Sequence, residues 1–205
     1  MIEGGRHLGN VSLVQIQPRG LIYPSPSGEV YDPSRRLEVK RLLITPLGVE
    51  ASGPDGERIL DIHHMHHPDK AYDSKDLVSI GFSSHYEVMR ARFGGHMVDG
   101  AAGENMIVEC ERAVWRDDLG QQIAVESAQT GSRAFFDIVR VATPCREFSH
   151  FAAGSPPESL PADELKSTLQ FLDNGRRGFL LVLAAGQQAA TVEPGDRVFA
   201  VHQAE

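Results

Sequence analysis

The chain has 205 residues, of which 41% are hydrophobic and 23% are charged, values typical of one folded domain spanning residues 1–205. Its formal net charge of −8 argues against a broad nucleic-acid surface. The longest apolar run, near residues 178–185, is too short to span a bilayer, and two cysteines do not make a disulfide framework. We therefore expect a cytoplasmic protein with reduced thiols and neither a nucleic-acid nor a membrane partner.

Short β-branched and aliphatic runs, separated by glycine and proline, dominate the chain. They predict strands over residues 10–17, 37–44, 106–108, 121–127, 136–141, 178–183 and 197–202. Helices are predicted over residues 84–92, with a capping-box spacing of Ser84 and Glu87, and over residues 161–174, where Pro161 starts and Asn174 ends a leucine stripe. Many strands with a few helices predict a mainly β fold, barrel-like and closed, with inserted helices.

Cys145 is the first candidate for chemistry, because it follows a predicted strand and Pro144 ends the ladder just before it. A thiol at a strand end, next to Arg146, could lie in a pocket where positive charge favours the thiolate. The alternative is a buried, inert cysteine. His150 lies five residues further on, so a cysteine–histidine couple is also open.

Four of the nine histidines fall within residues 63–67. Their spacing could supply two metal ligands, with Asp61 or Asp69 as a third, but no second ligand pair completes a zinc signature. The same histidines could instead form a polar pocket wall for an anion, or a solvated loop.

Residues 100–106 read GAAGENM, a turn of small residues that leads into a predicted strand. Its backbone N–H groups could face an anion, Glu104 could act as a base, and Asn105 could bond a polar ring edge. The alternative is a turn in which both side chains cap backbone groups. After the long helix, Arg176 and Arg177 either meet an anion or face solvent.

Taken in order, several short motifs resemble the MOSC domain, the C-terminal domain of molybdenum-cofactor sulfurases. They are residues 47–50 (LGVE), His63-His64 followed by 69–71 (DKA), residues 100–106, Thr143-Pro144-Cys145, residues 178–183 (GFLLVL) and residues 194–196 (PGD). The resemblance covers about residues 40–201. The usual His-His-Gly-Gly is replaced here by HHMHHP, and Ala101-Ala102 replaces an expected aromatic residue.

The resemblance implies a closed β-barrel, a suspected molybdenum cofactor, and Cys145 as a sulfur-holding or molybdenum-ligating residue. It places His64, Lys70, Glu104, Asn105, Thr143 and Arg146 around that cofactor. It further implies a sulfur transferase or a molybdenum-dependent reductase of N-hydroxylated small-molecule substrates, served by a sulfur donor or an electron-transfer protein. The aminotransferase-like domain is absent, so pyridoxal phosphate is not expected in this chain. The alternative is a non-catalytic module that binds a small anion or a partner protein.

Overall fold

The computed structural model describes residues 5–69 and 78–202. Within these ranges the strands are β1 (Arg6–Ile16), β2 (Ile22–Ser25), β3 (Gly28–Tyr31), β4 (Leu37–Glu38), β5 (Leu42–Thr45), β6 (Gly48–Ser52), β7 (Arg58–Leu60), β8 (Val78–Phe82), β9 (Met106–Glu109), β10 (Gln122–Glu126), β11 (Arg133–Val141), β12 (Phe179–Leu183), β13 (Ala190–Val192) and β14 (Arg197–Val201). The helices are α1 (Ser83–Phe93), α2 (Arg146–Ala152) and α3 (Ala162–Leu172), with 3₁₀ turns at Pro33–Arg35 and Arg116–Asp118.

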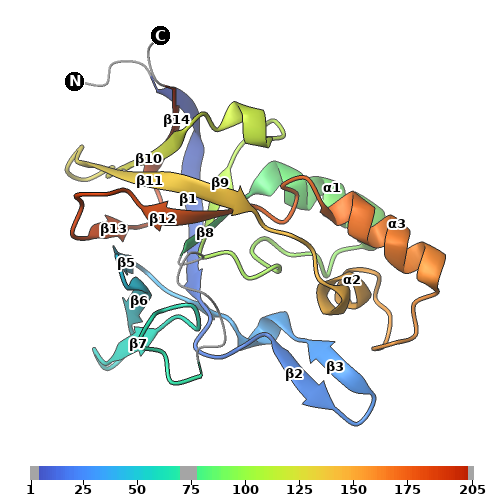
Figure 1. Ribbon diagram of the computed structural model, residues 1–205. Helices are drawn as coiled ribbons and strands as arrows, with labels where there is room; N and C mark the ends of the chain where they lie inside the picture. The colour runs from blue at the N-terminus through green and yellow to red at the C-terminus, as the bar shows by residue number, and fades with distance from the viewer. Residues whose placement is uncertain (1–4, 70–77, 203–205) are drawn as a thin grey trace.

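Seven strands form a closed barrel in the order β14-β10-β11-β12-β8-β9-β1, and β1 pairs with β14 to close it. All neighbours are antiparallel except β8 and β9, which run parallel. The sheet β13-β5-β6-β7 and the hairpin β2–β3 lie to one side of the barrel (Figure 1). The predicted mainly β fold, with a closed barrel and inserted helices, is confirmed.

Alternating apolar residues fill the barrel. Ile123 and Val125 of β10 lie opposite Ala200 and Val198 of β14, and all four are buried in one hydrophobic cluster. Successive side chains of a strand point to opposite faces, so a period of two places these residues on the inner face. In these two strands the barrel core therefore follows directly from the sequence pattern.

The helices pack outside the barrel around a second hydrophobic cluster. Tyr86 and Met89 of α1, Phe148 of α2 and Leu172 of α3 are buried there, together with Tyr31 from the hairpin. Figure 1 shows the three helices on one side of the barrel, with the hairpin next to α2. In residues 5–69 and 78–202, no helix has the length and apolar character needed to cross a membrane.

The structure differs from the predicted elements where the chain changes sheets. The strand predicted over residues 37–44 is two strands, because β4 pairs with β1 whereas β5 pairs with β13. The prediction missed the hairpin β2–β3, since Pro24 and Pro26 argue against a strand there. It also missed α2, whose seven residues are too few for a helical period to stand out.

Candidate functional site

A cavity of about 270 Å³ lies where the end of β11, the hairpin and the start of β12 meet. We call it the Cys145 pocket. Its lining residues with polar side chains are Gln17, His63, Ser79, Glu104, Arg140, Thr143, Cys145 and Arg177, besides Tyr31. They come from segments far apart in the sequence that the closing barrel brings together.

Cys145 lies at the N-terminus of α2, at the edge of this pocket. β11 ends at Val141, and Cys145 is the N-cap of α2, where its Sγ accepts a hydrogen bond from the Phe148 N–H at 3.4 Å. The side chain is partly buried and lines the cavity. The N-cap hydrogen bond therefore fixes the position of the thiol, which still lines the Cys145 pocket.

Burial raises the pKa of the Cys145 thiol above its ordinary value. The charge of Arg177 and the Phe148 N–H act in the opposite direction, whereas Glu147 raises this pKa further through its charge and its hydrogen bond with the thiol. The cation that favours the thiolate is thus Arg177, not the neighbouring Arg146 that the sequence suggested. Arg146 is exposed and pairs with Glu158 at 3.1 Å.

Arg177 forms one wall of the pocket. Its two terminal nitrogens donate to the carbonyl oxygens of Thr143 (2.9 Å) and Ala102 (3.2 Å), and its guanidinium lies 4.4 Å from the Phe148 ring centre. Its Nε is buried and has no hydrogen-bond partner among the described residues. This nitrogen is closed off from the cavity, so Arg177 acts on a group bound there through its charge.

Glu104 forms the floor of the pocket within the small-residue turn. It is 2% exposed, and its carboxyl accepts a hydrogen bond from the Tyr86 hydroxyl, which in turn accepts the Ala102 N–H. Burial raises the pKa of Glu104, although Tyr86 and the charges of Arg177 and Arg36 act against that rise. Because its ionisation is costly, Glu104 is not suited to act as a permanent negative charge in the pocket. Its hydrogen bonds with Tyr86 connect the turn to α1.

This raised pKa has a consequence for stability. Between about pH 4.5 and the raised pKa, the folded state holds a proton on Glu104 that the unfolded chain has released, so stability falls as pH rises through that window. Replacing Glu104 by Gln removes this loss. We expect E104Q to gain stability relative to wild type with rising pH, by up to about 1.4 kcal/mol per pH unit, in urea unfolding at a series of pH values. E109Q, on the exposed end of β9, is the control, and a pH-independent difference would contradict the assignment.

Asn105 does not line the pocket. It is 2% exposed; its side-chain oxygen accepts from the backbone N–H and hydroxyl of Ser79, and its amide donates to Asp61 and to the Gln15 carbonyl. These hydrogen bonds occupy the side-chain oxygen and nitrogen of Asn105 that the sequence analysis expected to bond a ligand ring. Asn105 therefore positions the pocket rather than facing it.

The histidine cluster is folded into tight turns. His64 is fully buried, its Nδ1 accepts the His66 N–H at 3.1 Å, and its Nε2 has no partner within the described ranges. His67 bonds the Pro18 carbonyl, and the Asp69 N–H donates to its other nitrogen. Of this cluster, His63 lines the Cys145 pocket.

Of the alternatives for these histidines, metal binding gains no support from the described residues. Residues 5–69 and 78–202 contain no group of three His, Cys, Asp or Glu side chains placed to hold an ion. His64 does not line the pocket, and Lys70 lies outside the described residues. Thr143 and Glu104 are the predicted cofactor-binding residues that do line it, together with Cys145.

His150 does not couple with Cys145. A separation of five residues turns about 140° around a helix, and His150 accordingly lines a different cavity. The prediction also missed Ser79, Gln17 and Arg140, which no local motif singles out. Arg177 was noted only as part of a turn after the long helix.

No protein-family model matches the chain, and no curated protein matches it significantly. Solved structures with a similar fold include YuaD from Bacillus subtilis (12% identity, TM-score 0.51, covering 93% of this chain and 97% of that one). A hypothetical protein is 12% identical with a TM-score of 0.51, covering 96% of this chain and 68% of that one. YiiM from Geobacillus stearothermophilus is 16% identical with a TM-score of 0.51, covering 94% and 75%. At these identities the likeness shows the fold, and it is consistent with a MOSC-like barrel.

Proposed function

We propose that this protein carries sulfur on Cys145. The observation that supports this most directly is that the Cys145 thiol lines a concave pocket of which the Arg177 guanidinium forms one wall. A thiolate is the form that attacks sulfur, and a nearby cation stabilises both the thiolate and a persulfide anion. The free thiols of Cys110 and Cys145 suit the reducing cytoplasm, where we place this activity.

The transfer we propose moves one sulfur atom without any external oxidant. The Cys145 thiol loses its proton to solvent, and the thiolate, stabilised by the charge of Arg177, attacks the outer sulfur of a persulfide presented by a donor protein. The donor S–S bond breaks, the donor leaves as a thiol after taking a proton, and Cys145 becomes a persulfide. Attack of an acceptor thiolate on the outer sulfur then forms a persulfide on the acceptor and returns the Cys145 thiolate, so each step is a thiol–disulfide exchange.

A second candidate, ligation of a molybdenum cofactor, is favoured by the size of the cavity, which exceeds what a persulfide needs. The residues fit in kind. Cys145 supplies a soft thiolate for the metal, and the charge of Arg177 and the Thr143 hydroxyl suit a phosphate. When bound, such a cofactor would supply two-electron chemistry, such as reduction of an N–O bond in a small-molecule substrate with electrons from a partner protein.

The test loads the purified chain with glutathione persulfide and measures the intact mass and the modified peptide over time. We expect a gain of one sulfur atom on Cys145. Replacing Arg177 by Met removes the positive wall, so we expect loading to slow by about tenfold, whereas Arg177→Lys keeps the charge and should slow it less.

Elemental analysis of protein made in a molybdenum-replete host distinguishes the two candidates. Molybdenum in proportion to protein, lost in the C145S variant, would favour the cofactor. If the chain gains no sulfur on Cys145 and holds no molybdenum, both candidates fail, and a non-catalytic module for a small anion or a partner protein would be the better account.

A further inference from the structure

The outer side of helix α3 carries opposite charges at its two ends. Asp163, Ser167 and Phe171 recur every four residues and therefore share one side of the helix, whereas Thr168 and Leu172 are buried. Figure 1 shows α3 at the edge of the molecule, with α1 beside it. We call this surface the α3 face, and it consists of Asp163, Glu164, Ser167 and Phe171 of α3 with Arg92 and Arg176.

Two arginines form the basic end of the α3 face. The guanidinium carbons of Arg92 and Arg176 each lie 4.3 Å from the centre of the Phe171 ring, so they cannot be farther apart than twice that distance. Arg92 also donates to the Ser167 hydroxyl at 3.0 Å, and Arg176 donates to the Phe171 carbonyl oxygen. Burial and the charge of Arg92 lower the pKa of Arg176. Among the described residues neither arginine has an ion-pair partner, so this end is a fixed and uncompensated positive charge.

Two carboxylates form the acidic end of the α3 face. Asp163 and Glu164 lie in the first turn of α3, and both are exposed. Within the part of the chain that the structure describes, neither of them forms an ion pair. Asp163 and Phe171 are eight residues apart, which is about 12 Å along a helix axis. The two ends are therefore separate, and each lacks a partner of the opposite charge.

The neighbouring apolar side chains favour a protein partner over a small anion. Val88 precedes Arg92 by one turn of α1 and is 44% exposed. Trp115 is 37% exposed, and the Arg176 guanidinium carbon lies 5.4 Å from its ring centre. Exposed tryptophan and arginine side chains are the types that contribute most to protein–protein interfaces. A protein surface could bury these side chains and also supply charges to both ends.

A second copy of this chain supplies those charges in the required arrangement. A twofold dimer uses the same surface in both copies, so that surface must be complementary to itself. If two α3 helices run antiparallel about an axis beside Ser167, the acidic end of each copy faces the basic end of the other. We propose that the chain forms a twofold homodimer through the α3 face.

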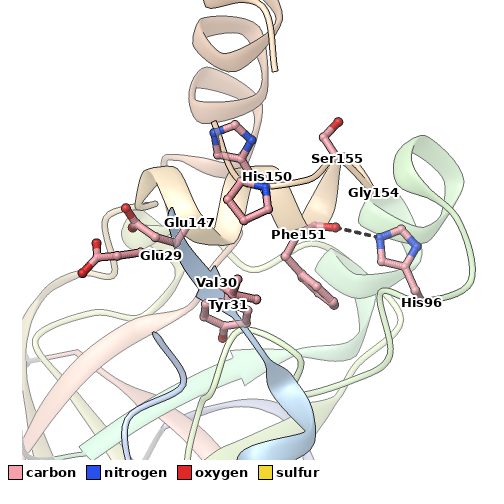
Figure 2. A pocket seen from close by; sticks show the side chains of 10 residues that line it. Glu29, Val30, Tyr31, His96, Glu147, His150, Phe151, Gly154 and Ser155 are labelled. Carbon is pink, nitrogen blue, oxygen red and sulfur yellow. Dashed lines mark hydrogen bonds between the residues drawn. The ribbon is translucent and has the colours of Figure 1, made fainter. Parts of the chain in front are cut away.

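This surface is separate from both cavities of the molecule. One is the Cys145 pocket, and the other, of about 240 Å³, is lined in part by His96, His150 and Phe151, as Figure 2 shows. No residue of the α3 face lines either cavity. The proposed dimer therefore does not depend on the sulfur chemistry, and the C145S variant should dimerise as the wild type does.

The experiment measures the mass of the full chain by sedimentation equilibrium over a range of protein concentrations. We expect a dimer for the wild type. The R92E/R176E variant has two acidic ends and the D163K/E164K variant has two basic ends, so each should dimerise at least about hundredfold more weakly, because like charges meet twice across the axis. A mixture of the two variants should form a heterodimer, because every contact then joins opposite charges.

The control is R19E/K40E, which changes the net charge as R92E/R176E does, at two exposed residues outside the helices; it should dimerise as the wild type does. Thermal unfolding shows whether each variant folds, and R92E alone replaces the double variant if R176E prevents folding. A monomeric wild type would overturn the proposal and favour an acidic partner protein at this face. Charge variants that still dimerise alone, or folded variants that do not associate when mixed, would also overturn it.

Discussion

Replacing Cys145 by serine is expected to lower sulfur loading at least about hundredfold, because a serine hydroxyl is a far weaker nucleophile than a thiol and cannot form a persulfide. The fold should survive this change. Serine is a preferred N-cap residue, and its oxygen can accept the Phe148 N–H that the Cys145 Sγ now accepts. The measurement is the rate at which the intact mass increases with glutathione persulfide, with thermal unfolding of the same samples.

Cys110→Ser is the matched control for this variant. Cys110 is also a partly buried free thiol, and its sulfur contacts the Ser84 hydroxyl at 3.2 Å. It does not line the Cys145 pocket, so the C110S variant should load at the wild-type rate. If sulfur loading survives in C145S but disappears in C110S, then Cys110 carries the sulfur and the assignment to Cys145 is wrong.

The sequence predicted what depends on short-range pattern. The leucine stripe with Pro161 and Asn174 placed α3 to within a few residues, and the proline before Cys145 placed that thiol at a strand end. Short β-branched and aliphatic runs likewise placed β10 and β14. In each of these segments, the local pattern and the tertiary structure favour the same conformation.

The parts that were missed depend on contacts between distant segments. Arg177 reaches the pocket because the turn before β12 folds tightly against β8. Gly178 has φ +86°, and a Cβ there would collide with the Ile80 carbonyl oxygen. No property of the dipeptide Arg176-Arg177 tells which of the two arginines that turn directs at Cys145. Which cation lies beside Cys145 could therefore be seen only in the three-dimensional structure.

The role of Asp61 also depends on contacts between distant segments and could not be predicted from the sequence. The sequence offers it as a metal ligand beside the histidines, but its carboxylate is fully buried and already accepts four hydrogen bonds. They come from the Gln17 N–H (2.8 Å), the His63 N–H (2.9 Å), the His63 Nδ1 (2.8 Å) and the Asn105 amide (3.0 Å). Two of these donors are at least 44 positions away. Asp61 therefore joins the segments that carry Gln17, His63 and Glu104 to the Cys145 pocket.

Replacing Asp61 by Asn should therefore destabilise the protein by about 2–3 kcal/mol. An amide cannot accept four hydrogen bonds. If the new amide nitrogen faces Gln17 and Asn105, the Gln17 N–H and the Asn105 amide each lose their acceptor and face an N–H donor instead. If it faces His63, the ring can change tautomer, but the His63 backbone N–H still loses its partner. Urea unfolding at pH 7 measures the loss, and the exposed Asp55→Asn is the control, expected within about 0.5 kcal/mol of wild type.

The pH dependence of this difference tests the cause. Burial alone would raise the pKa of Asp61, but the hydrogen bonds and the charge of His63 outweigh it and hold the pKa below its ordinary value. A lowered pKa stabilises the folded state above the unfolded value near pH 4, and that stabilisation is lost as the pH falls further. The D61N variant lacks this contribution, so the gap between wild type and D61N should narrow below about pH 4. A gap that stays constant from pH 7 to pH 3 would mean that packing, and not the charged hydrogen-bond acceptor, joins these segments around the pocket.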